Sequence, residues 1–386
     1  MPPVSIMIKP ASSACNMRCD YCFYHDVAEH RAEASLGIMT GETARHIIDK
    51  AFDYANGQQV AFAFQGGEPT LAGLDYFREF MAHAKEVNAN NSPVFYGMQT
   101  NGLLIDRAWA EFLKQENFLV GLSLDGDPKA NHNRKKIDGE NAHETILQAA
   151  QLLNQYEVPY NILTVLTGEC AGNIENIYKY FKRMGFRFLQ FIPCLRPFGN
   201  EKHQPQDQPW TRAASGDEVF TQVRNKSNSP LYMTSEQYGK FLIALFQLYV
   251  KDYVRGGYVS IRQFDNMVRL YLGQPTEQCG MLGHCTFQYV VEANGNAYPC
   301  DFYCLDEWRL GNIADTDFQQ MRGHPKAKQF IKESMEVPAR CKSCRFFRMC
   351  RGGGCKRERE SADYCGAYRT FFNSCLPLFR VFAGER

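Results

Sequence analysis

Three cysteines lie close together near the start of the chain, in the stretch ASSACNMRCDYCFYHD. Cys15, Cys19 and Cys22 are separated by three and then two residues. Three thiolates can hold three irons of a cubane [4Fe–4S] cluster and leave the fourth iron open to a small ligand with amino and carboxylate groups. The alternative is a closed zinc site completed by His25 or His30. The spacing therefore predicts a metal centre, and an open iron–sulfur cluster explains the missing fourth ligand.

A second group of cysteines lies in the last third of the chain. Its eight thiols are enough for two [4Fe–4S] clusters held entirely by protein, and a pair of zinc knuckles is the alternative. The eight are Cys279, Cys285, Cys300, Cys341, Cys344, Cys350, Cys355 and Cys365. The four cysteines outside both groups are expected to be small buried hydrophobic residues. They are Cys170, Cys194, Cys304 and Cys375.

The composition argues against a nucleic-acid-binding, membrane or exported protein. Lys and Arg number 43 against 42 Asp and Glu, so no strong field attracts nucleic acid or an anionic membrane. The N-terminus lacks the pattern of an export signal, and the apolar run 241–250 is too short to span a bilayer. A chain with 15 cysteines and no export signal is expected in the reducing cytoplasm, where cysteines bind metals or do redox chemistry.

The elements that must position the cysteines follow a repeating pattern in the first half of the chain. Short β-rich runs alternate with amphipathic stretches, which predicts a parallel α/β sheet with right-handed crossovers. The β-rich runs are 4–10, 60–65, 94–99, 118–124, 160–167 and 186–193. Helices are predicted over 41–55, 74–87 and 141–156.

Distinctive loops follow the first four runs. The three cysteines come after the first, GGEPT after the second, TNG after the third and DGDP after the fourth. In a parallel barrel or sheet these loops open on one face, where active sites lie. The sequence therefore predicts that they form one site.

The chain is expected to divide into two parts. Residues 196–235 are polar and rich in Pro, Gln, Asn and Ser, as in a linker. This predicts a catalytic domain over 1–235, ending in that linker, and a second domain over 236–386 with a C-terminal helix. The cysteine-dense part of the second domain is expected to be rich in loops and to need metal centres for stability.

The cysteine loop resembles the signature of the radical S-adenosylmethionine (SAM) superfamily, with aromatic Tyr21 before the third cysteine. The resemblance implies a partial (β/α)6 TIM-like barrel. It also implies that the GGEP glycines bind the methionine amino group of SAM, and that Asp125 lies near the cofactor. The SAM-binding residues implied are Tyr21, Gln65, Gly66, Gly67, Glu68, Gln99, Asn101, Ser123 and Arg134.

The later cysteines resemble the SPASM domain of radical SAM enzymes that modify peptides and proteins. The resemblance implies one auxiliary [4Fe–4S] cluster on Cys279, Cys285, Cys300 and Cys355, and another on Cys341, Cys344, Cys350 and Cys365. Three clusters are thus expected in all. Where three residues usually precede the last cysteine of this knot, CRGGGC has four.

Motifs over nearly the whole chain look like those of anaerobic sulfatase-maturating enzymes. They include IKPASSACNMRCDYCFYH, AFQGGEPTLAGLDYF, SIRQFDN and YPCDFYCLDEWRLGNI. The resemblance implies oxygen-independent oxidation of a sulfatase cysteine or serine, in a Cys/Ser-x-Pro-x-Arg segment, to Cα-formylglycine through a 5′-deoxyadenosyl radical. It makes Asp301 the expected base and places Tyr24 in the same pocket. Gln190 and Asp265 are further pocket candidates.

The expected partners follow from that chemistry. The auxiliary clusters are expected to accept an electron, and a flavodoxin or ferredoxin to supply one. The alternative function is a radical SAM/SPASM maturase that installs thioether or carbon–carbon crosslinks in a ribosomal peptide. The first β-rich run begins at residue 4, so a leader-recognition domain is not expected ahead of the barrel, which favours the sulfatase substrate.

Overall fold

Six parallel strands form the centre of the molecule. The computed structural model describes residues 3–198 and 229–384. The six predicted strands are confirmed as β1 Val4–Lys9, β2 Val60–Phe64, β3 Val94–Thr100, β4 Phe118–Ser123, β5 Tyr160–Leu166 and β6 Phe188–Pro193. Each pairs in parallel with the next along the chain. Buried Val, Ile, Leu and Phe side chains dominate these strands, as a sheet covered by helices requires.

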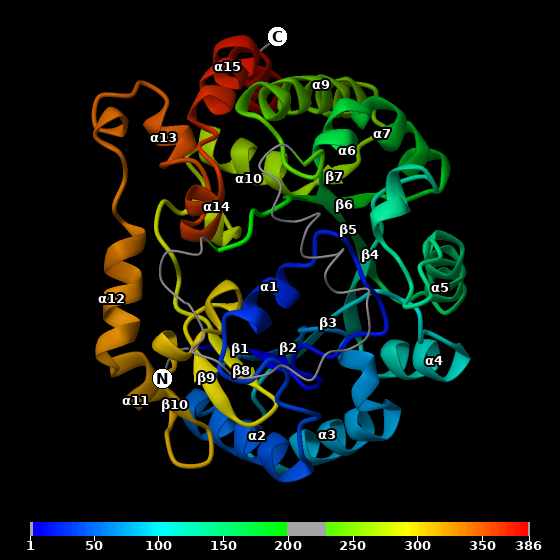
Figure 1. Ribbon diagram of the computed structural model, residues 1–386, viewed down its shortest axis with the longest axis vertical. Coiled ribbons are helices and arrows are strands. Elements are labelled where there is room, and N and C mark those ends of the chain that lie inside the picture. The colour runs from blue at the N-terminus through cyan, green and yellow to red at the C-terminus, as the bar shows by residue number, and fades with distance from the viewer. Residues whose placement is uncertain (1–2, 199–228, 385–386) are drawn as a thin grey trace.

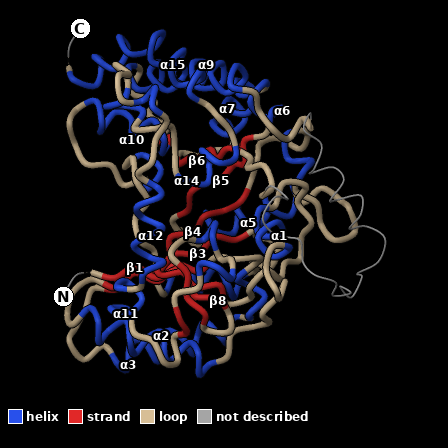
Figure 2. The backbone as a smooth tube through the Cα atoms, turned by 60° about the vertical axis from the view of Figure 1, so that its left-hand side comes forward, coloured by secondary structure: helices blue, strands red, loops and turns tan. Residues whose placement is uncertain are grey.

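Helices cover the outside of these strands (Figures 1 and 2). In the first half they are α2 Gly41–Ala55, α3 Leu74–Val87, α4 Arg107–Gln115, α5 His143–Gln155, α6 Gly168–Gly172 and α7 Ile174–Arg183. The short helix α1 Phe23–Glu29 is not one of them, and Figure 1 shows it at the centre of the view. The predicted helices are α2, α3 and α5. Each is amphipathic and buries one apolar face, as Ile47, Ile48 and Phe52 of α2 illustrate.

The sheet continues into the second half of the chain. The added strands are β7 Ser260–Ile261, β8 Tyr289–Glu292, β9 Asn296–Tyr298 and β10 Gly311–Asn312. β7 lies beside β6, and β8 lies parallel to the opposite edge at β1, giving the order β10-β9-β8-β1-β2-β3-β4-β5-β6-β7. The predicted partial barrel is confirmed, and the second half of the chain extends both of its edges.

The second half is otherwise built from helices and loops. Its helices are α9 Ser235–Val254, α10 Arg262–Tyr271, α11 Phe318–Gly323, α12 Pro325–Ser334, α13 Phe347–Cys350, α14 Lys356–Ser361 and α15 Cys365–Cys375. Short 3-10 helices are η1 Pro69–Ala72, η2 Ala130–Asn133, η3 Cys279–Met281, η4 Asp301–Tyr303, η5 Asp306–Trp308, η6 Ala339–Cys341 and η7 Leu376–Ala383. The predicted C-terminal helix is α15, which lies along α9 (Figure 1). Between η3 and α15 the helices are short and the loops long, as predicted.

Three further predictions concern these parts of the chain. The apolar run 241–250 lies within α9, and none of the helices in residues 3–198 and 229–384 has the length and apolar character that crossing a membrane requires. Most of the predicted linker, residues 199–228, lies outside the described residues. The division at 235/236 stays a prediction. Lastly, Cys170, Cys194, Cys304 and Cys375 are all buried, as expected.

Candidate active site

The loops that follow β1 to β4 meet around one pocket. The predicted residues of the first half that line it are Cys15, Cys19, Tyr21, Cys22, Tyr24, Gln65, Gly66, Gly67, Glu68, Gln99, Asn101, Ser123 and Arg134. Parallel strands present their carboxyl ends on the same side, which brings these separate loops together. Gln190 does not line this pocket and instead accepts a hydrogen bond from Arg262. Asp265 lies elsewhere and accepts hydrogen bonds from Tyr249, Tyr258 and Ser260.

The three N-terminal thiols lie near one another in this pocket. Burial raises the pKa of Cys15 to about 12, and the nearby Cys22 and Glu68 raise it further as negative groups. Burial also raises the pKa of Cys19, and the nearby Cys22 and Cys15 raise it further. Buried thiols of this kind stay protonated unless a metal centre compensates the thiolate charge. Their arrangement is suited to such a centre.

The GGEP loop packs directly on the cysteine loop. Gly66 has a φ of +121°, and a Cβ at Gly67 would lie 2.0 Å from the carbonyl oxygen of Ala14. The Gly67 N–H donates to the Ser12 carbonyl at 2.8 Å. The glycines are therefore required for close approach to the chain itself, in addition to lining the pocket.

Glu68 connects the loops that follow β2 and β3. Its carboxylate accepts hydrogen bonds from the Thr100 hydroxyl at 2.8 Å and from the Asn101 N–H at 2.7 Å. It also accepts from the backbone and side chain of Thr70. Burial raises the pKa of Glu68, although these hydrogen bonds lower it in part. Both oxygens brace the protein, so the structure gives Glu68 a scaffolding role.

Arg134 brings a buried positive charge to the pocket. Its guanidinium donates to Asp125 at 2.9 Å and lies over the ring of Tyr21, 5.5 Å from the centroid. The Tyr21 hydroxyl also donates to Asp125. The Nε of Arg134 is buried and has no hydrogen-bond partner among the described residues. A carboxylate in the pocket would satisfy this group, because guanidinium binds carboxylate well.

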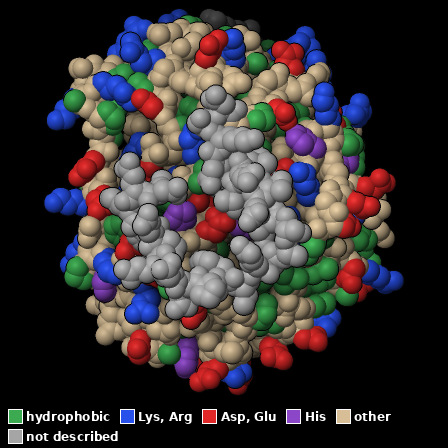
Figure 3. Space-filling view, in the orientation of Figure 1, with side chains coloured by type: hydrophobic (Ala, Val, Ile, Leu, Met, Phe, Trp, Pro, Cys, Tyr) green, Lys and Arg blue, Asp and Glu red, His purple; other side chains and the backbone are tan. Residues whose placement is uncertain are grey.

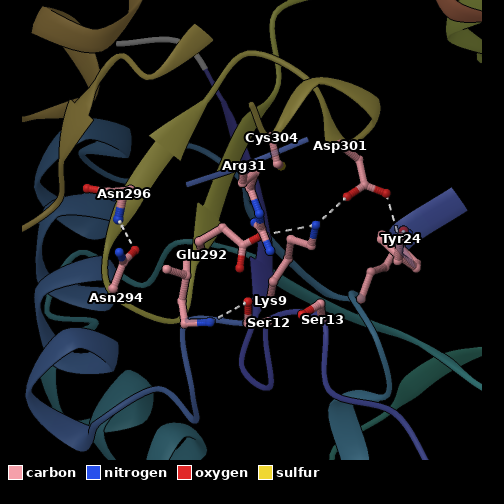
Figure 4. A network of polar contacts seen from close by, with 12 residues as sticks. Lys9, Ser12, Ser13, Tyr24, Arg31, Glu292, Asn294, Asn296, Asp301 and Cys304 are labelled. Carbon is pink, nitrogen blue, oxygen red and sulfur yellow. Dashed lines mark hydrogen bonds and ion pairs between the residues drawn. The ribbon is translucent and has the colours of Figure 1, made fainter. Parts of the chain in front are cut away.

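Asp301 belongs to a network that reaches this pocket from the second half of the chain (Figure 4). The hydroxyl of Tyr24, which lines the pocket, donates to Asp301 Oδ2 at 2.8 Å and lies 3.3 Å from Gln65 Oε1. Phe23 of α1 packs edge-on against Phe302 of η4, with ring centroids 4.8 Å apart. This contact holds α1 against η4 and so holds Tyr24 against Asp301.

Lys9 is the residue that the sequence analysis missed. It ends β1, is 2% exposed, and its Nζ lies 3.3 Å from Asp301 Oδ1 and 3.2 Å from Glu292 Oε1. Glu292 is its register partner on β8 and also binds Arg31 at 2.5 Å. The signal in the sequence was a lysine at the carboxyl end of a predicted buried strand, directly before the cysteine loop. Lysine is rarely buried unless it is paired with a negative group.

The positive and negative groups in this network stabilise one another in their charged forms. Burial alone would lower the pKa of Lys9, but Cys304 and the carboxylates of Glu292 and Asp301 raise it above its ordinary value. Burial would raise the pKa of Glu292, yet Lys9 and Arg31 hold it below the ordinary value. Burial, and then the charge of Asp301, raise the pKa of Tyr24. Lys9 is therefore a cation and Tyr24 a hydrogen-bond donor beside Asp301.

The division of the eight later thiols into two ligand sets stays a prediction, and the surroundings of these thiols are compatible with it. Burial, and then the nearby Cys355 and Cys285, raise the pKa of Cys300. Burial, and then the nearby Glu358, Cys285 and Cys279, raise the pKa of Cys355. Burial, and then the nearby Cys341, Cys365 and Cys344, raise the pKa of Cys350. Within the described ranges, no cluster of three or more His, Cys, Asp or Glu side chains is arranged to hold a single metal ion.

Three glycines account for the extra residue in CRGGGC. Gly352, Gly353 and Gly354 have φ of +98°, +87° and +99°, a left-handed run that other residues rarely adopt. The run separates Cys350 from Cys355, which are predicted to belong to different sets. Cys355 then lies at the start of α14 and packs against Gly280, beside Cys279 of its own set.

Two family models match this chain, one in each half. Residues 10–181 match the family model of the radical SAM superfamily, and residues 283–345 match that of an iron–sulfur cluster-binding domain called SPASM. These matches favour iron–sulfur clusters over the zinc alternatives at both cysteine groups.

Similar proteins cover nearly the full length. A cysteine-type anaerobic sulfatase-maturating enzyme of Clostridium perfringens is 43% identical, with 98% of this chain and 97% of the relative covered. A serine-type enzyme of Bacteroides thetaiotaomicron is 30% identical, with 97% and 90% covered. The solved structure of native anSMEcpe with bound AdoMet and Cp18Cys peptide has a TM-score of 0.86 at 41% identity, with 99% of both chains covered. Streptococcus suis SuiB bound to precursor peptide SuiA has a TM-score of 0.59 at 16% identity, with 94% of this chain and 73% of that chain covered, which shows the fold alone.

Proposed function

The chain belongs to the anaerobic sulfatase-maturating enzymes of the radical SAM superfamily, which convert an active-site cysteine or serine of a sulfatase to formylglycine, and we propose that it acts on cysteine. Greater similarity to the cysteine-type relatives supports this choice, since they are 39–43% identical and the serine-type relatives 26–30%. The substrate proposed is a sulfatase segment of the Cys-x-Pro-x-Arg type. The crosslinking alternative has no comparable support, because the relatives that cover nearly the full length are sulfatase-maturating enzymes.

Three [4Fe–4S] clusters are proposed, one on each set of thiols. Cys15, Cys19 and Cys22 would hold the first. Cys279, Cys285, Cys300 and Cys355 would hold the second, and Cys341, Cys344, Cys350 and Cys365 the third. When bound, the first cluster and SAM supply a 5′-deoxyadenosyl radical that removes a hydrogen atom from the substrate Cβ. The donor sets suit this cofactor because each consists of cysteines alone.

SAM is proposed to bind in the pocket beside the first set of thiols. Gly66 and Gly67 offer backbone groups there, and polar side chains come from Gln99 in β3, Asn101 directly after it and Ser123 at the end of β4. The buried Arg134 Nε would meet the SAM carboxylate. Tyr21 and Glu68 hold these groups in position through the hydrogen bonds described above.

Asp301 is proposed as the base that takes the proton from the substrate side chain. The observation that carries this assignment is the Tyr24 hydroxyl, which lies at the SAM pocket and also donates to Asp301 at 2.8 Å. Lys9 and Tyr24 fix the carboxylate from two sides, and we propose them as positioning residues. The physiological electron donor is proposed to be a flavodoxin or a ferredoxin.

Gly67→Ala is expected to weaken SAM binding about tenfold or more. The added methyl group would lie 2.0 Å from a backbone oxygen of the cysteine loop, and overpacking of this kind costs about 1–3 kcal/mol, where 1.4 kcal/mol is a factor of ten. Equilibrium binding of SAM to the iron-loaded protein measures the effect. Gly172→Ala is the control, because a Cβ there meets nothing within 4 Å and should leave affinity unchanged. Equal affinities for the two variants would contradict the proposed role of the loop.

The choice of cysteine over serine is tested with two peptides that differ only at the target residue. We expect the cysteine peptide to react with a kcat/KM about tenfold or more above that of the serine peptide, the size of discrimination that single-atom changes can give. Formylglycine is the product from both, so one mass-spectrometric assay serves both peptides. Preference for serine would assign the chain to the other type while leaving the family unchanged.

A further inference from the structure

The third set of cysteines lies in a strongly basic stretch. Residues 340–357 contain seven Lys and Arg and no Asp or Glu, whereas the rest of the chain has 36 basic and 42 acidic residues. A basic residue directly follows three of the four cysteines of this set, as Lys342, Arg345 and Arg351. Positive charge is thus concentrated around one proposed cluster, in a chain that is otherwise slightly acidic.

Of these seven side chains, Arg340, Arg345 and Lys356 line the cavity that contains the four thiols, which Glu333, Glu336, Glu360 and Asp363 also line. Cys341, Cys344, Cys350 and Cys365 line that cavity together with Arg345 and Arg369. We define the basic face as Lys342, Arg345, Arg348, Arg351 and Arg369. Figure 3 shows Lys and Arg side chains along the upper left margin of the molecule, where Figure 1 draws α13.

Most of this charge is not neutralised within the protein. Lys342, Arg348 and Arg369 are exposed, and none of them has an ion-pair partner in residues 3–198 or 229–384. Arg340, just before the first cysteine of the set, is paired with Asp363 at 2.6 Å and so contributes less. Phe347 at the start of α13 is 40% exposed in the middle of this sequence. An exposed aromatic ring among unpaired cations is typical of a protein-binding surface.

We propose that the basic face docks a small acidic one-electron carrier protein over Cys341, Cys344 and Cys350. The inference rests on the proposed function, because it requires a cluster at these cysteines. Complementary charge speeds encounter and fixes orientation, while electron-transfer complexes stay small and short-lived. The carrier is expected to present carboxylates to the basic face and a flat apolar spot to Phe347.

A one-electron carrier is needed to start the reaction. Two electrons leave the substrate cysteine. One leaves with the hydrogen atom that becomes part of 5′-deoxyadenosine, and the other leaves alone after Asp301 takes the proton. The cleavage of SAM consumes one electron, so the electron consumed and the electron released alone balance over one turnover. A reduced carrier supplies the first electron.

The test compares flavodoxin binding to the iron-loaded parent and to the triple variant Lys342→Glu, Arg348→Glu, Arg369→Glu. We expect the triple variant to bind about tenfold or more weakly at low ionic strength, and added salt to weaken binding to the parent far more than to the variant. The control is Lys179→Glu, Arg183→Glu, Arg187→Glu, which reverses three exposed charges at α7 and the start of β6. Figure 1 shows α7 and α13 on opposite sides of the molecule.

Two further measurements keep the result interpretable. Iron content establishes that each variant holds its clusters, and Lys342→Gln, Arg348→Gln is the milder variant if the triple variant loses iron. Formylglycine formation driven by dithionite bypasses the carrier, so it should be equal in parent and triple variant. Failure of that reaction in the parent would count against the proposed function and leave the binding comparison to decide the docking.

Equal flavodoxin affinities for the triple variant and its control would overturn the proposal. So would affinity that does not depend on salt, because the basic face would then contribute nothing to the encounter. Binding of RNA to the basic face, without binding of flavodoxin, would assign it to another kind of partner and would also overturn the proposal.

Discussion

Asp301→Asn is expected to lower the rate of formylglycine formation about 100- to 10,000-fold, the usual contribution of a positioned general base. The amide cannot take the proton that the substrate side chain must lose. Its oxygen can still accept a hydrogen bond from Tyr24 or Lys9, so the local structure should survive. Formation of 5′-deoxyadenosine should continue, because the cysteine loop and the SAM pocket are unchanged. Single-turnover assays that quantify both products separate these effects.

The control for this variant is Asp306→Asn, five residues further along the same segment. Asp306 is exposed and accepts a hydrogen bond from the Ala32 N–H at 2.8 Å, outside the network around Asp301. Its rate should stay within about twofold of the parent, as is usual for surface substitutions. A parental rate in Asp301→Asn would mean that another group takes the proton, and the assignment of Asp301 would be wrong.

Cys15→Ala is expected to abolish both products. Two thiols cannot hold the open cluster, and no SAM cleavage is expected without it. Iron should fall from about twelve to about eight atoms per chain, because the auxiliary clusters have their own complete ligand sets. Iron and sulfide analysis of the protein purified without oxygen measures this, together with the yield of 5′-deoxyadenosine.

Cys375→Ala is the matched control for that experiment. Cys375 is fully buried at the end of α15 and belongs to none of the three sets of thiols. Its removal should leave the iron content unchanged. Retention of about twelve irons and of 5′-deoxyadenosine in Cys15→Ala would contradict the three-thiolate centre.

The six barrel strands and three of their helices could be predicted from sequence because their signals are local. A buried parallel strand is a run of Val, Ile and Phe, and a covering helix has an apolar stripe, as in β2 and α2. The loops after the strands could be assigned to one site for a related reason, since a parallel sheet opens them on one face. That geometry predicts one shared site, whereas the SAM-binding roles of its residues come from the resemblance to radical SAM enzymes.

The extensions of the sheet could not be predicted in this way. β8 has four residues and β9 three, and their position beside β1 depends on a partner almost 300 residues away. Lys9 was missed for the same reason. Its position at the end of β1 is visible in the sequence, but its function depends on Glu292 and Asp301, which only the folded chain brings to it.

The spacing in CRGGGC shows a different limit. The sequence reveals an extra residue between Cys350 and Cys355 but cannot say how the chain accommodates it. In the structure three consecutive glycines adopt left-handed conformations, and Cys355 joins Cys279 and Cys285. Backbone conformations of this kind depend on contacts from distant segments, such as the approach of Gly280 to Cys355.

The most direct test of the account is a single anaerobic reaction. The iron-loaded protein is incubated with SAM, dithionite and a sulfatase peptide of the Cys-x-Pro-x-Arg type, and the peptide is analysed by mass spectrometry. The account predicts that the target cysteine loses one sulfur and two hydrogens and gains one oxygen, with 5′-deoxyadenosine formed alongside. 5′-Deoxyadenosine without any change in the peptide would contradict the sulfatase-maturating function and leave only the SAM chemistry.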